Sequence, residues 1–149
     1  MIQLSIAQVM DYAVPMIRQC MGAEVGSRAE GEFSTDSEGD STGLYGLFDR
    51  GTLICIAGIG SEISSKKVWL GYLAVHPDYR GKGLGKHGLQ YVEEVARDRG
   101  YEWMFVETYG NPIFDAAISL YEASGYIHVG ELLDYLDDGS DVVYLRKTL

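Results

Sequence analysis

The chain has 149 residues, of which 46% are hydrophobic and 23% charged, a composition typical of one folded globular domain and not of a disordered chain. Twelve Lys and Arg residues stand against 22 Asp and Glu residues, so the formal net charge is −10. This charge disfavours binding to nucleic acid or to an anionic membrane surface, but a local basic patch can still hold a small polyanion.

The N-terminal part predicts a short strand, a helix and an acidic segment. Residues Ile2–Ile6 alternate apolar and polar positions, and Ala7–Met21 has apolar residues at helical spacing with an irregularity expected at Pro15. Residues 22–42, rich in Glu, Asp, Ser and Gly, predict a loop or short helix followed by a mobile segment. Its acidic residues are Glu24, Glu30, Glu32, Asp36, Glu38 and Asp40.

Three strands are predicted in the middle of the chain. Leu44–Asp49 and Thr52–Gly60 flank a turn at Asp49-Arg50-Gly51, a pattern typical of a hairpin. Lys67–Val75 is apolar on both faces, which predicts an interior strand of a sheet covered on two sides.

Helices and strands alternate in the second half, which indicates an α/β protein with a mixed sheet. An amphipathic helix is expected at Leu84–Arg99 and a strand at Glu102–Thr108. Asn111 is a candidate N-cap and Pro112 a candidate first residue of a helix that ends before Gly125. Two closing strands follow, Tyr126–Glu131 and Asp141–Arg146.

Neither metal binding nor export is indicated by the sequence. Cys20 and Cys55 lack metal-ligand spacing, and we expect two buried, reduced thiols and no metal. The N-terminus has no basic region followed by an apolar one, and no run reaches the roughly 18 apolar residues of a membrane span. We therefore expect a cytoplasmic protein without a membrane partner.

The clearest ligand-binding signal lies between the strand Lys67–Val75 and the helix that follows it. The strand ends at His76-Pro77, because proline has no N–H with which to continue the ladder. Gly81, Gly83 and Gly85 then permit positive φ angles and close approach of a ligand. Free amides converge there at the positive end of a helix dipole. The basic residues at this point are Arg80, Lys82, Lys86 and His87.

This pattern predicts a pyrophosphate site, although a glycine-rich turn with solvated lysines is an alternative interpretation. Its spacing differs from the dinucleotide fingerprint G-x-G-x-x-G and from the P-loop. Arg80–Gly85 instead resembles the R/Q-x-x-G-x-G/A signature for acyl-CoA in the GNAT superfamily of N-acetyltransferases. Leu73–Pro77 resembles the fourth strand of that family, and Leu120–Tyr126 resembles its C-terminal L-Y-E-x-x-G-F/Y motif.

The resemblance implies one domain over residues 1–149. Its fold would be a mixed, mostly antiparallel sheet of six to seven strands, flanked by about four helices and containing a splayed central strand pair. It also implies direct transfer of an acetyl group from acetyl-CoA to a primary amine through a tetrahedral intermediate. The backbone of Leu73, Ala74 and Val75 would pair with the pantetheine arm, and an N–H there would polarise the thioester. The implied pyrophosphate ligands are Arg80, Gly81, Lys82, Gly83, Leu84, Gly85 and Lys86.

Tyr121 matches the tyrosine that protonates the departing thiolate in this family, and its reference pKa near 10 requires no unusual shift. The same spacing also fits a tyrosine that only packs on a helix face. Trp69 stands where many relatives carry a glutamate base. Glu107, a carboxylate of the N-terminal acidic segment, or a water chain could replace that base. Asn111 precedes Tyr121 by ten residues instead of the usual seven, so it either contacts CoA or only caps a helix.

The acceptor is the least defined partner. The acidic segment already named and a second acidic cluster would attract a cationic amine, although surface solvation explains such carboxylates equally well. The second cluster comprises Asp134, Asp137, Asp138 and Asp141, and the candidate aromatic walls are Tyr45, Trp69, Tyr72 and Tyr109. A non-catalytic acyl-CoA sensor and a nucleotide-binding α/β module are the competing functions. The sequence leaves the oligomeric state open, including a homodimer.

Overall fold

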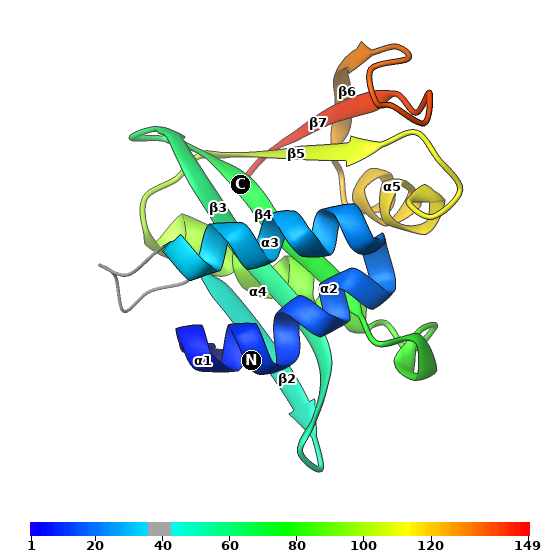
Figure 1. Ribbon diagram of the computed structural model, residues 1–149. Helices are drawn as coiled ribbons and strands as arrows, with labels where there is room; N and C mark the ends of the chain where they lie inside the picture. The colour runs from blue at the N-terminus through cyan, green and yellow to red at the C-terminus, as the bar shows by residue number, and fades with distance from the viewer. Residues whose placement is uncertain (36–42) are drawn as a thin grey trace. The chain divides into compact units, whose positions relative to one another are not determined.

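The structure is a computed structural model that describes residues 1–35 and 43–149. Asp36, Glu38, Asp40 and the mobile segment predicted around them lie outside the described residues. The described strands form one seven-stranded sheet in the order β1-β2-β3-β4-β5-β7-β6, and Figure 1 labels all of them except β1. They are β1 (Ile2–Gln3), β2 (Leu44–Asp49), β3 (Thr52–Ser64), β4 (Lys67–Val75), β5 (Trp103–Tyr109), β6 (Ile127–Leu132) and β7 (Val142–Thr148).

The α-helices are α1 (Ile6–Gln8), α2 (Val14–Met21), α3 (Ala23–Thr35), α4 (Leu84–Asp98) and α5 (Asp115–Ala123). A π-helical segment, η1 (Val9–Ala13), joins α1 to α2, and a short 3-10 helix, η2 (Pro77–Tyr79), follows β4. The β4–β5 pair is parallel, whereas β1–β2, β2–β3, β5–β7 and β6–β7 are antiparallel. The predicted α/β class with a mixed, mostly antiparallel sheet is therefore confirmed.

The chain divides into two compact units. Unit 1 comprises Met1–Ile59 and Gly71–Val92, and unit 2 comprises Gly60–Leu70 and Glu93–Leu149. β3, β4 and α4 each contribute residues to both units. The expectation of one domain over residues 1–149 stays a prediction.

In unit 1, the first strand is shorter than predicted. β1 ends at Gln3 because Ser5 starts a helix: its Oγ accepts a hydrogen bond from Gln8 N at 3.3 Å, and Gln8 Oε1 accepts one from Ser5 N at 3.1 Å. This reciprocal pair is a capping box, which ends the extended segment. The irregularity expected near Pro15 is the π-helical segment η1 immediately before α2.

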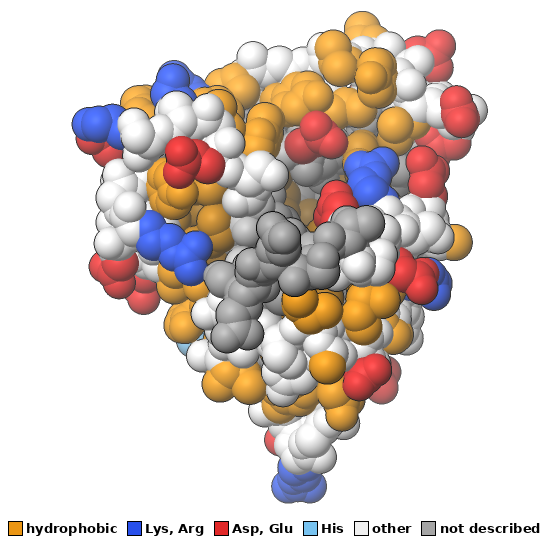
Figure 2. Space-filling model, turned by 60° about the vertical axis from the view of Figure 1, so that its left-hand side comes forward, with side chains coloured by type: hydrophobic (Ala, Val, Ile, Leu, Met, Phe, Trp, Pro, Cys, Tyr) orange, Lys and Arg blue, Asp and Glu red, His pale blue; other side chains and the backbone are white. Residues whose placement is uncertain are grey.

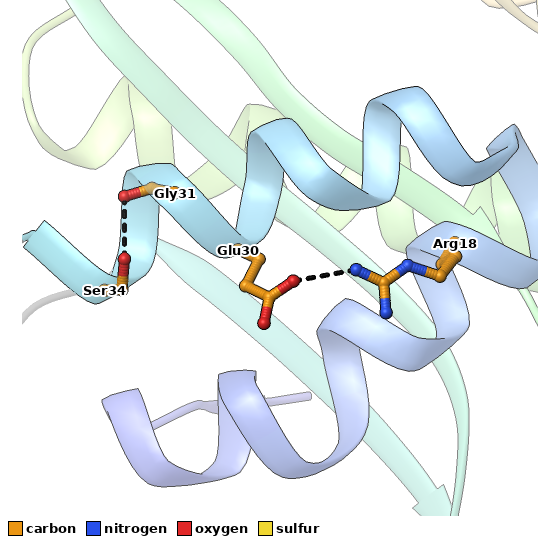
Figure 3. Close-up of polar contacts among 4 residues, drawn as sticks. All are labelled: Arg18, Glu30, Gly31 and Ser34. Carbon is orange, nitrogen blue, oxygen red and sulfur yellow. Dashed lines mark hydrogen bonds and ion pairs between the residues drawn. The ribbon is translucent and has the colours of Figure 1, made fainter.

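Helices α2 and α3 pack closely because a glycine stands at their contact. A Cβ added to Gly26 would lie 2.5 Å from Arg18 Cβ, so only glycine fits here. Arg18 Nη2 forms an ion pair with Glu30 Oε2 at 2.8 Å, and Ser34 Oγ donates to Gly31 O at 3.1 Å (Figure 3). The acidic segment that sequence left as a loop or short helix thus begins with a helix of 13 residues.

The β2–β3 hairpin of unit 1 has the predicted turn. Arg50 (φ 47°) and Gly51 (φ 87°) both adopt positive φ. Two-residue hairpin turns of this kind match the right-handed twist of the flanking strands. The prediction made from the Asp49–Thr52 spacing is confirmed.

In unit 2, β5, β7 and β6 form an antiparallel sheet that continues from the first residues of β4 (Figure 1). The parallel β4–β5 ladder pairs Lys67–Trp69 with Trp103–Phe105. The predicted splay of the central strand pair concerns residues of both units and stays a prediction. Glu93, almost fully buried, is neutralised by Lys147 Nζ at 2.7 Å and by Arg97 Nη2 at 3.6 Å.

The two cysteines differ in burial. Cys55 is fully buried, and burial raises the pKa of its thiol to about 12. Cys20 is only half-buried, so the expectation of two buried thiols holds for Cys55 and only in part for Cys20. Within residues 1–35 and 43–149, no helix combines the length and apolarity that crossing a bilayer requires.

Candidate active site

The end of β4 is fixed by main-chain hydrogen bonds in unit 1. His76 N donates to Ile54 O at 2.9 Å, and Pro77 then opens η2. The ring of His76 accepts a hydrogen bond from Asp78 N through Nδ1 at 3.3 Å, which caps this short helix. The strand therefore ends at His76-Pro77, as predicted from the missing main-chain N–H of Pro77.

Two glycines of the following turn adopt conformations that L-residues rarely populate. The φ angles are 73° at Gly81 and 78° at Gly83. A Cβ added at either position would meet no atom within 4 Å among the described residues. Glycine is thus required by the backbone and not by crowding, and the space beside the main chain is open.

Helix α4 begins directly after these glycines, and its first main-chain amides form no hydrogen bond inside the helix. The first intrahelical bond at this end runs from His87 N to Gly83 O at 3.0 Å. The N–H groups of Leu84, Gly85 and Lys86 precede that bond, so they have no acceptor inside the helix. They lie at the positive end of the helix dipole, the arrangement that binds phosphate in other proteins.

Basic side chains surround this turn and one of them links it to β4. Arg80 Nε donates to Val75 O at 3.3 Å, and Lys82 Nζ donates to Asp78 O at 3.5 Å while lying 4.8 Å from the Tyr79 ring centre. Arg80, Lys82 and Lys86 are all exposed. Unit 1 therefore brings together the whole predicted cofactor segment, from Leu73–Val75 to Arg80–Lys86.

Sequence reasoning missed the residues that hold α4 against the sheet. A Cβ added to Gly88 would lie 3.1 Å from Cys55 Sγ and 3.3 Å from Leu73 Cδ1, so glycine permits a close approach of the helix to β3 and β4. Cys55 Sγ also donates to Leu84 O at 3.5 Å. The signal was the presence of a glycine within the apolar stripe of an amphipathic helix.

Tyr121, Glu107 and Asn111 belong to unit 2. Tyr121 is 6% exposed in α5, and its ring centre lies 5.7 Å from that of Tyr126. Burial raises the pKa of the Tyr121 phenol, so it stays protonated at neutral pH. This geometry fits both interpretations left by the sequence, a general acid and a packed tyrosine.

The N-cap predicted at Asn111 is wrong. Asn111 Oδ1 accepts a hydrogen bond from Ile113 N at 3.1 Å, and its carbonyl accepts one from Phe114 N at 3.0 Å. These bonds close a turn, which is a common alternative use of an asparagine side chain. Phe114 occupies the N-cap position of α5, and Pro112 lies in the turn instead of the helix.

Glu107 lies on β5 opposite Tyr144 of β7, and its side chain is exposed. The pKa of the Tyr144 phenol is raised by burial and then by the adjacent Glu107 carboxylate. Trp69 lies beside them, with its ring centre 6.1 Å from that of Tyr144 and 5.7 Å from that of Phe105. Trp69, where the resemblance implies a glutamate base, thus belongs to an aromatic cluster that includes a carboxylate.

Several predicted acceptor contacts have other roles. Glu30 pairs with Arg18, and Glu32 Oε2 accepts a hydrogen bond from Tyr72 Oη at 2.7 Å. Asp138 and Asp141 accept hydrogen bonds from main-chain amides of their own loop at 2.9 and 2.8 Å. The pKa of Asp138 is lowered by hydrogen bonds from the Ser140 side chain and then from the Ser140 amide. Figure 2 shows Asp and Glu side chains dispersed over the visible face, with Lys and Arg side chains between them.

Two further expectations are addressed by the described part of the chain. Tyr45 is buried and packs edge-on against Tyr91, so it belongs to the core of unit 1 and forms no aromatic wall. No group of three or more His, Cys, Asp or Glu side chains is arranged to hold a metal ion within residues 1–35 and 43–149.

Comparison with known proteins identifies relatives. The sequence profile described as "Acetyltransferase (GNAT) family" matches residues 11–126. The Bacillus subtilis (strain 168) protein named "Uncharacterized N-acetyltransferase YsnE" is 30% identical over 94 residues, which is 62% of this chain and 62% of that protein. Two further curated relatives are matched over 30% and 33% of their lengths, so the chain spans less than two thirds of the curated relatives it matches.

Solved structures share the fold at low sequence identity. Ard1 from Thermoplasma volcanium superimposes with a TM-score of 0.80 at 14% identity, covering 99% of this chain and 95% of that one. An aminoglycoside 6'-N-acetyltransferase complexed with coenzyme A gives a TM-score of 0.74 at 17% identity, covering 93% and 89%. At these identities the likeness concerns the arrangement of helices and strands alone.

Proposed function

The chain belongs to the Acetyltransferase (GNAT) family, and we propose that it transfers the acetyl group of acetyl-CoA to a primary amine. The observation that carries this proposal is the turn between β4 and α4. There, two positive-φ glycines with open space beside them precede three helix-terminal amides and are surrounded by exposed basic side chains. A diphosphate fits such a group of donors in charge and in hydrogen-bonding capacity.

The residues that we propose for the co-substrate follow from this geometry. Main-chain amides between Gly81 and Lys86 hold the diphosphate, with Arg80 and Lys82 adding positive charge. The backbone of Leu73–Val75 pairs with the pantetheine arm in the manner of an added strand. The bond from Arg80 Nε to Val75 O supports a shared role, because it connects the strand end to the glycine turn.

In the proposed reaction, the amine nitrogen attacks the acetyl carbon, a C–N bond forms, and the C–S bond breaks as thiolate leaves. Tyr121 donates its phenolic proton to the thiolate; burial raises the pKa of this phenol, so the proton is present at neutral pH before the transfer. Glu107 accepts the proton that the amine loses, through water. Asn111 remains a candidate contact of the CoA arm, although its side chain already bonds to Ile113 N.

A non-catalytic acyl-CoA sensor of the same fold is the alternative, and one observation favours it. Trp69 cannot accept a proton, and its ring packs on Phe105 and Tyr144. A sensor would retain the cofactor turn, whereas Tyr121 would have no departing thiolate to protonate. Turnover therefore separates the two functions, and binding of CoA does not.

An acetyl-CoA consumption assay with a panel of primary amines tests the proposal, together with calorimetric titration of CoA. We expect CoA to bind and thiol to be released with at least one amine, with the acetylated amine identified by mass spectrometry. Binding of CoA without turnover on any amine would favour the sensor. Equal thermal protection by ATP, NAD and acetyl-CoA would contradict both functions and favour a nucleotide-binding module.

A further inference from the structure

The two faces of the sheet in unit 2 differ in burial and composition. On one face, Val68, Met104 and Leu145 are completely buried. On the opposite face, Trp69, Phe105 and Tyr144 are only half-buried, although aromatic rings of this size are usually covered in a core. Because side chains alternate along a strand, Glu107 projects on the same face as Phe105.

Strand register places these four residues together. Trp69 is registered with Phe105 on the adjacent strand, and Glu107 is registered with Tyr144. The Trp69 ring contacts both other rings, at centre distances of 5.7 Å to Phe105 and 6.1 Å to Tyr144. We call Trp69, Phe105, Glu107 and Tyr144 the ring–carboxylate cluster.

Glu107 has no basic partner among the described residues, in contrast to three carboxylates of unit 2 that form ion pairs. Glu93 pairs with Lys147, Glu102 with Lys66, and Glu122 with His128. Across the described residues of both units, no Lys, Arg or His nitrogen lies within 4.0 Å of the Glu107 carboxylate. Its neighbours are rings, whose electron-rich faces add to the attraction that a carboxylate exerts on a cation.

The same sheet holds a cation on an aromatic ring elsewhere. Arg146 lies over the Trp103 ring, with its guanidinium carbon 4.5 Å from the ring centre. Arg146 is registered with Phe105, and Trp103 lies two residues before Phe105 on the same face of β5, so this protein cation and its indole adjoin the cluster. A cation–aromatic contact of the kind expected at the cluster therefore already occurs in this sheet, with Arg146 as the cation.

We propose that the ring–carboxylate cluster binds the alkylammonium group of the acceptor substrate. A single carboxylate matches a single positive charge, and the rings offer apolar contact to methylenes next to the charged nitrogen. The fitting substrate class is a linear monoammonium, such as a lysine-like side chain, in preference to a polyamine or a polyhydroxylated aminosugar. The assignment of this cation as the acceptor rests on the proposed function. The binding of an alkylammonium by the cluster does not depend on that function.

Binding is tested without acetyl-CoA. The chain has two tryptophans, so Trp103→Phe leaves Trp69 as the only indole and its fluorescence as a local reporter. Titration with n-butylammonium chloride, against sodium chloride at equal ionic strength, should give a saturable change. Glu107→Gln in this background should weaken the binding about tenfold, whereas Glu102→Gln, which alters an exposed carboxylate paired with Lys66, should not.

A linear response equal to that of sodium chloride, or equal affinity in Glu107→Gln and its control, would overturn the proposal. Circular dichroism of each variant confirms that it is folded. Tyr144→Phe, which keeps the ring, should retain most of the affinity, and Tyr144→Leu should lose more. This second pair tests the ring contribution without altering Trp69, the fluorescent reporter.

Steady-state kinetics then connect the cluster to the acceptor. With n-butylamine as acceptor, Trp69→Leu should raise the KM for the amine about tenfold with little change in kcat. Glucosamine and spermidine should show higher KM values than n-butylamine and smaller changes on mutation. Saturable binding without turnover on any amine would support the cluster as an alkylammonium site and contradict the proposed function. Turnover with an unchanged KM in Trp69→Leu would support the proposed acetyltransferase activity and contradict the binding of the acceptor by the cluster.

Discussion

The turn between β4 and α4 in unit 1 and the β5–α5–β7 region of unit 2 are built from different chemical groups. In the turn, the groups proposed to bind the ligand are main-chain amides, and two glycines leave the space beside them open. In unit 2, the proposed reacting groups are side chains that packing holds in place, the buried Tyr121 and the ring–carboxylate cluster. Backbone donors suit a ligand shared by many enzymes, whereas side chains can change with the acceptor.

This difference predicts which measured quantity responds to mutation in each region. Added bulk or charge in the turn should act on cofactor affinity, because the main chain itself is the binding group. Substitutions in unit 2 should act on turnover or on the acceptor KM and leave cofactor affinity unchanged. If variants of the turn changed turnover alone, or variants of unit 2 changed cofactor affinity, this division of roles between the two regions would be wrong.

The largest effect is expected for Gly83→Asp. A Cβ and a negative charge would enter the open space beside the amides, where the diphosphate is proposed to bind. Loss of one or two charge-assisted hydrogen bonds, each contributing about 1.5–3 kcal/mol, should weaken CoA binding by about 100-fold or more. Isothermal titration calorimetry with CoA measures this loss.

Gly100→Asp is the matched control. Gly100 follows the other end of α4, has a φ of 88°, and likewise has no atom within 4 Å of an added Cβ among the described residues. The control therefore carries the same backbone strain and the same charge, and its CoA affinity should stay close to that of the unmodified protein. A loss of no more than twofold in Gly83→Asp would remove the turn as the diphosphate site.

The next effect is expected for Tyr121→Phe. Removing a general acid should lower kcat about 100-fold while CoA affinity stays nearly constant. Thiol release under saturating acetyl-CoA and amine measures kcat, and calorimetry measures affinity. Unchanged turnover would make Tyr121 a packing residue only.

Tyr126→Phe controls for the loss of a buried phenol. The two rings are neighbours, and the Tyr126 hydroxyl is buried with no hydrogen-bond partner in the described part of the chain. An unpaired buried polar group destabilises a fold, so this variant should keep its turnover and be at least as stable as the parent. Equal loss of turnover in both variants would indicate a packing effect common to the two rings.

The contrast between the regions also explains what the sequence could predict. The hairpin at Arg50-Gly51, the end of β4 at His76-Pro77 and the glycine turn are local features, in which residues a few positions apart determine the backbone. The family resemblance rested on the same kind of local signature. The fold and the backbone geometry of the glycine turn were therefore predictable in outline.

The ring–carboxylate cluster was not predictable as a unit. Trp69, Glu107 and Tyr144 come from three strands, and only the register of β4, β5 and β7 places them together. Sequence reasoning related Glu107 to Trp69 only as a replacement base and did not consider Tyr144. Likewise, the carboxylates of Asp138 and Asp141 looked available for an amine, because the main-chain amides that they accept from depend on the loop conformation.

The smallest effect is expected for Asn111→Ala, which separates a role in the fold from a role in binding. The side chain accepts a hydrogen bond from Ile113 N at 3.1 Å and donates one to Ser140 Oγ at 3.4 Å, so it connects the β5–α5 turn to the loop before β7. Its loss should cost about 1 kcal/mol, or roughly 2–4 °C in Tm, while CoA affinity changes less than twofold. A greater loss of CoA affinity with unchanged Tm would instead place Asn111 on the CoA arm, and main-chain groups of unit 1 would no longer account for cofactor binding alone.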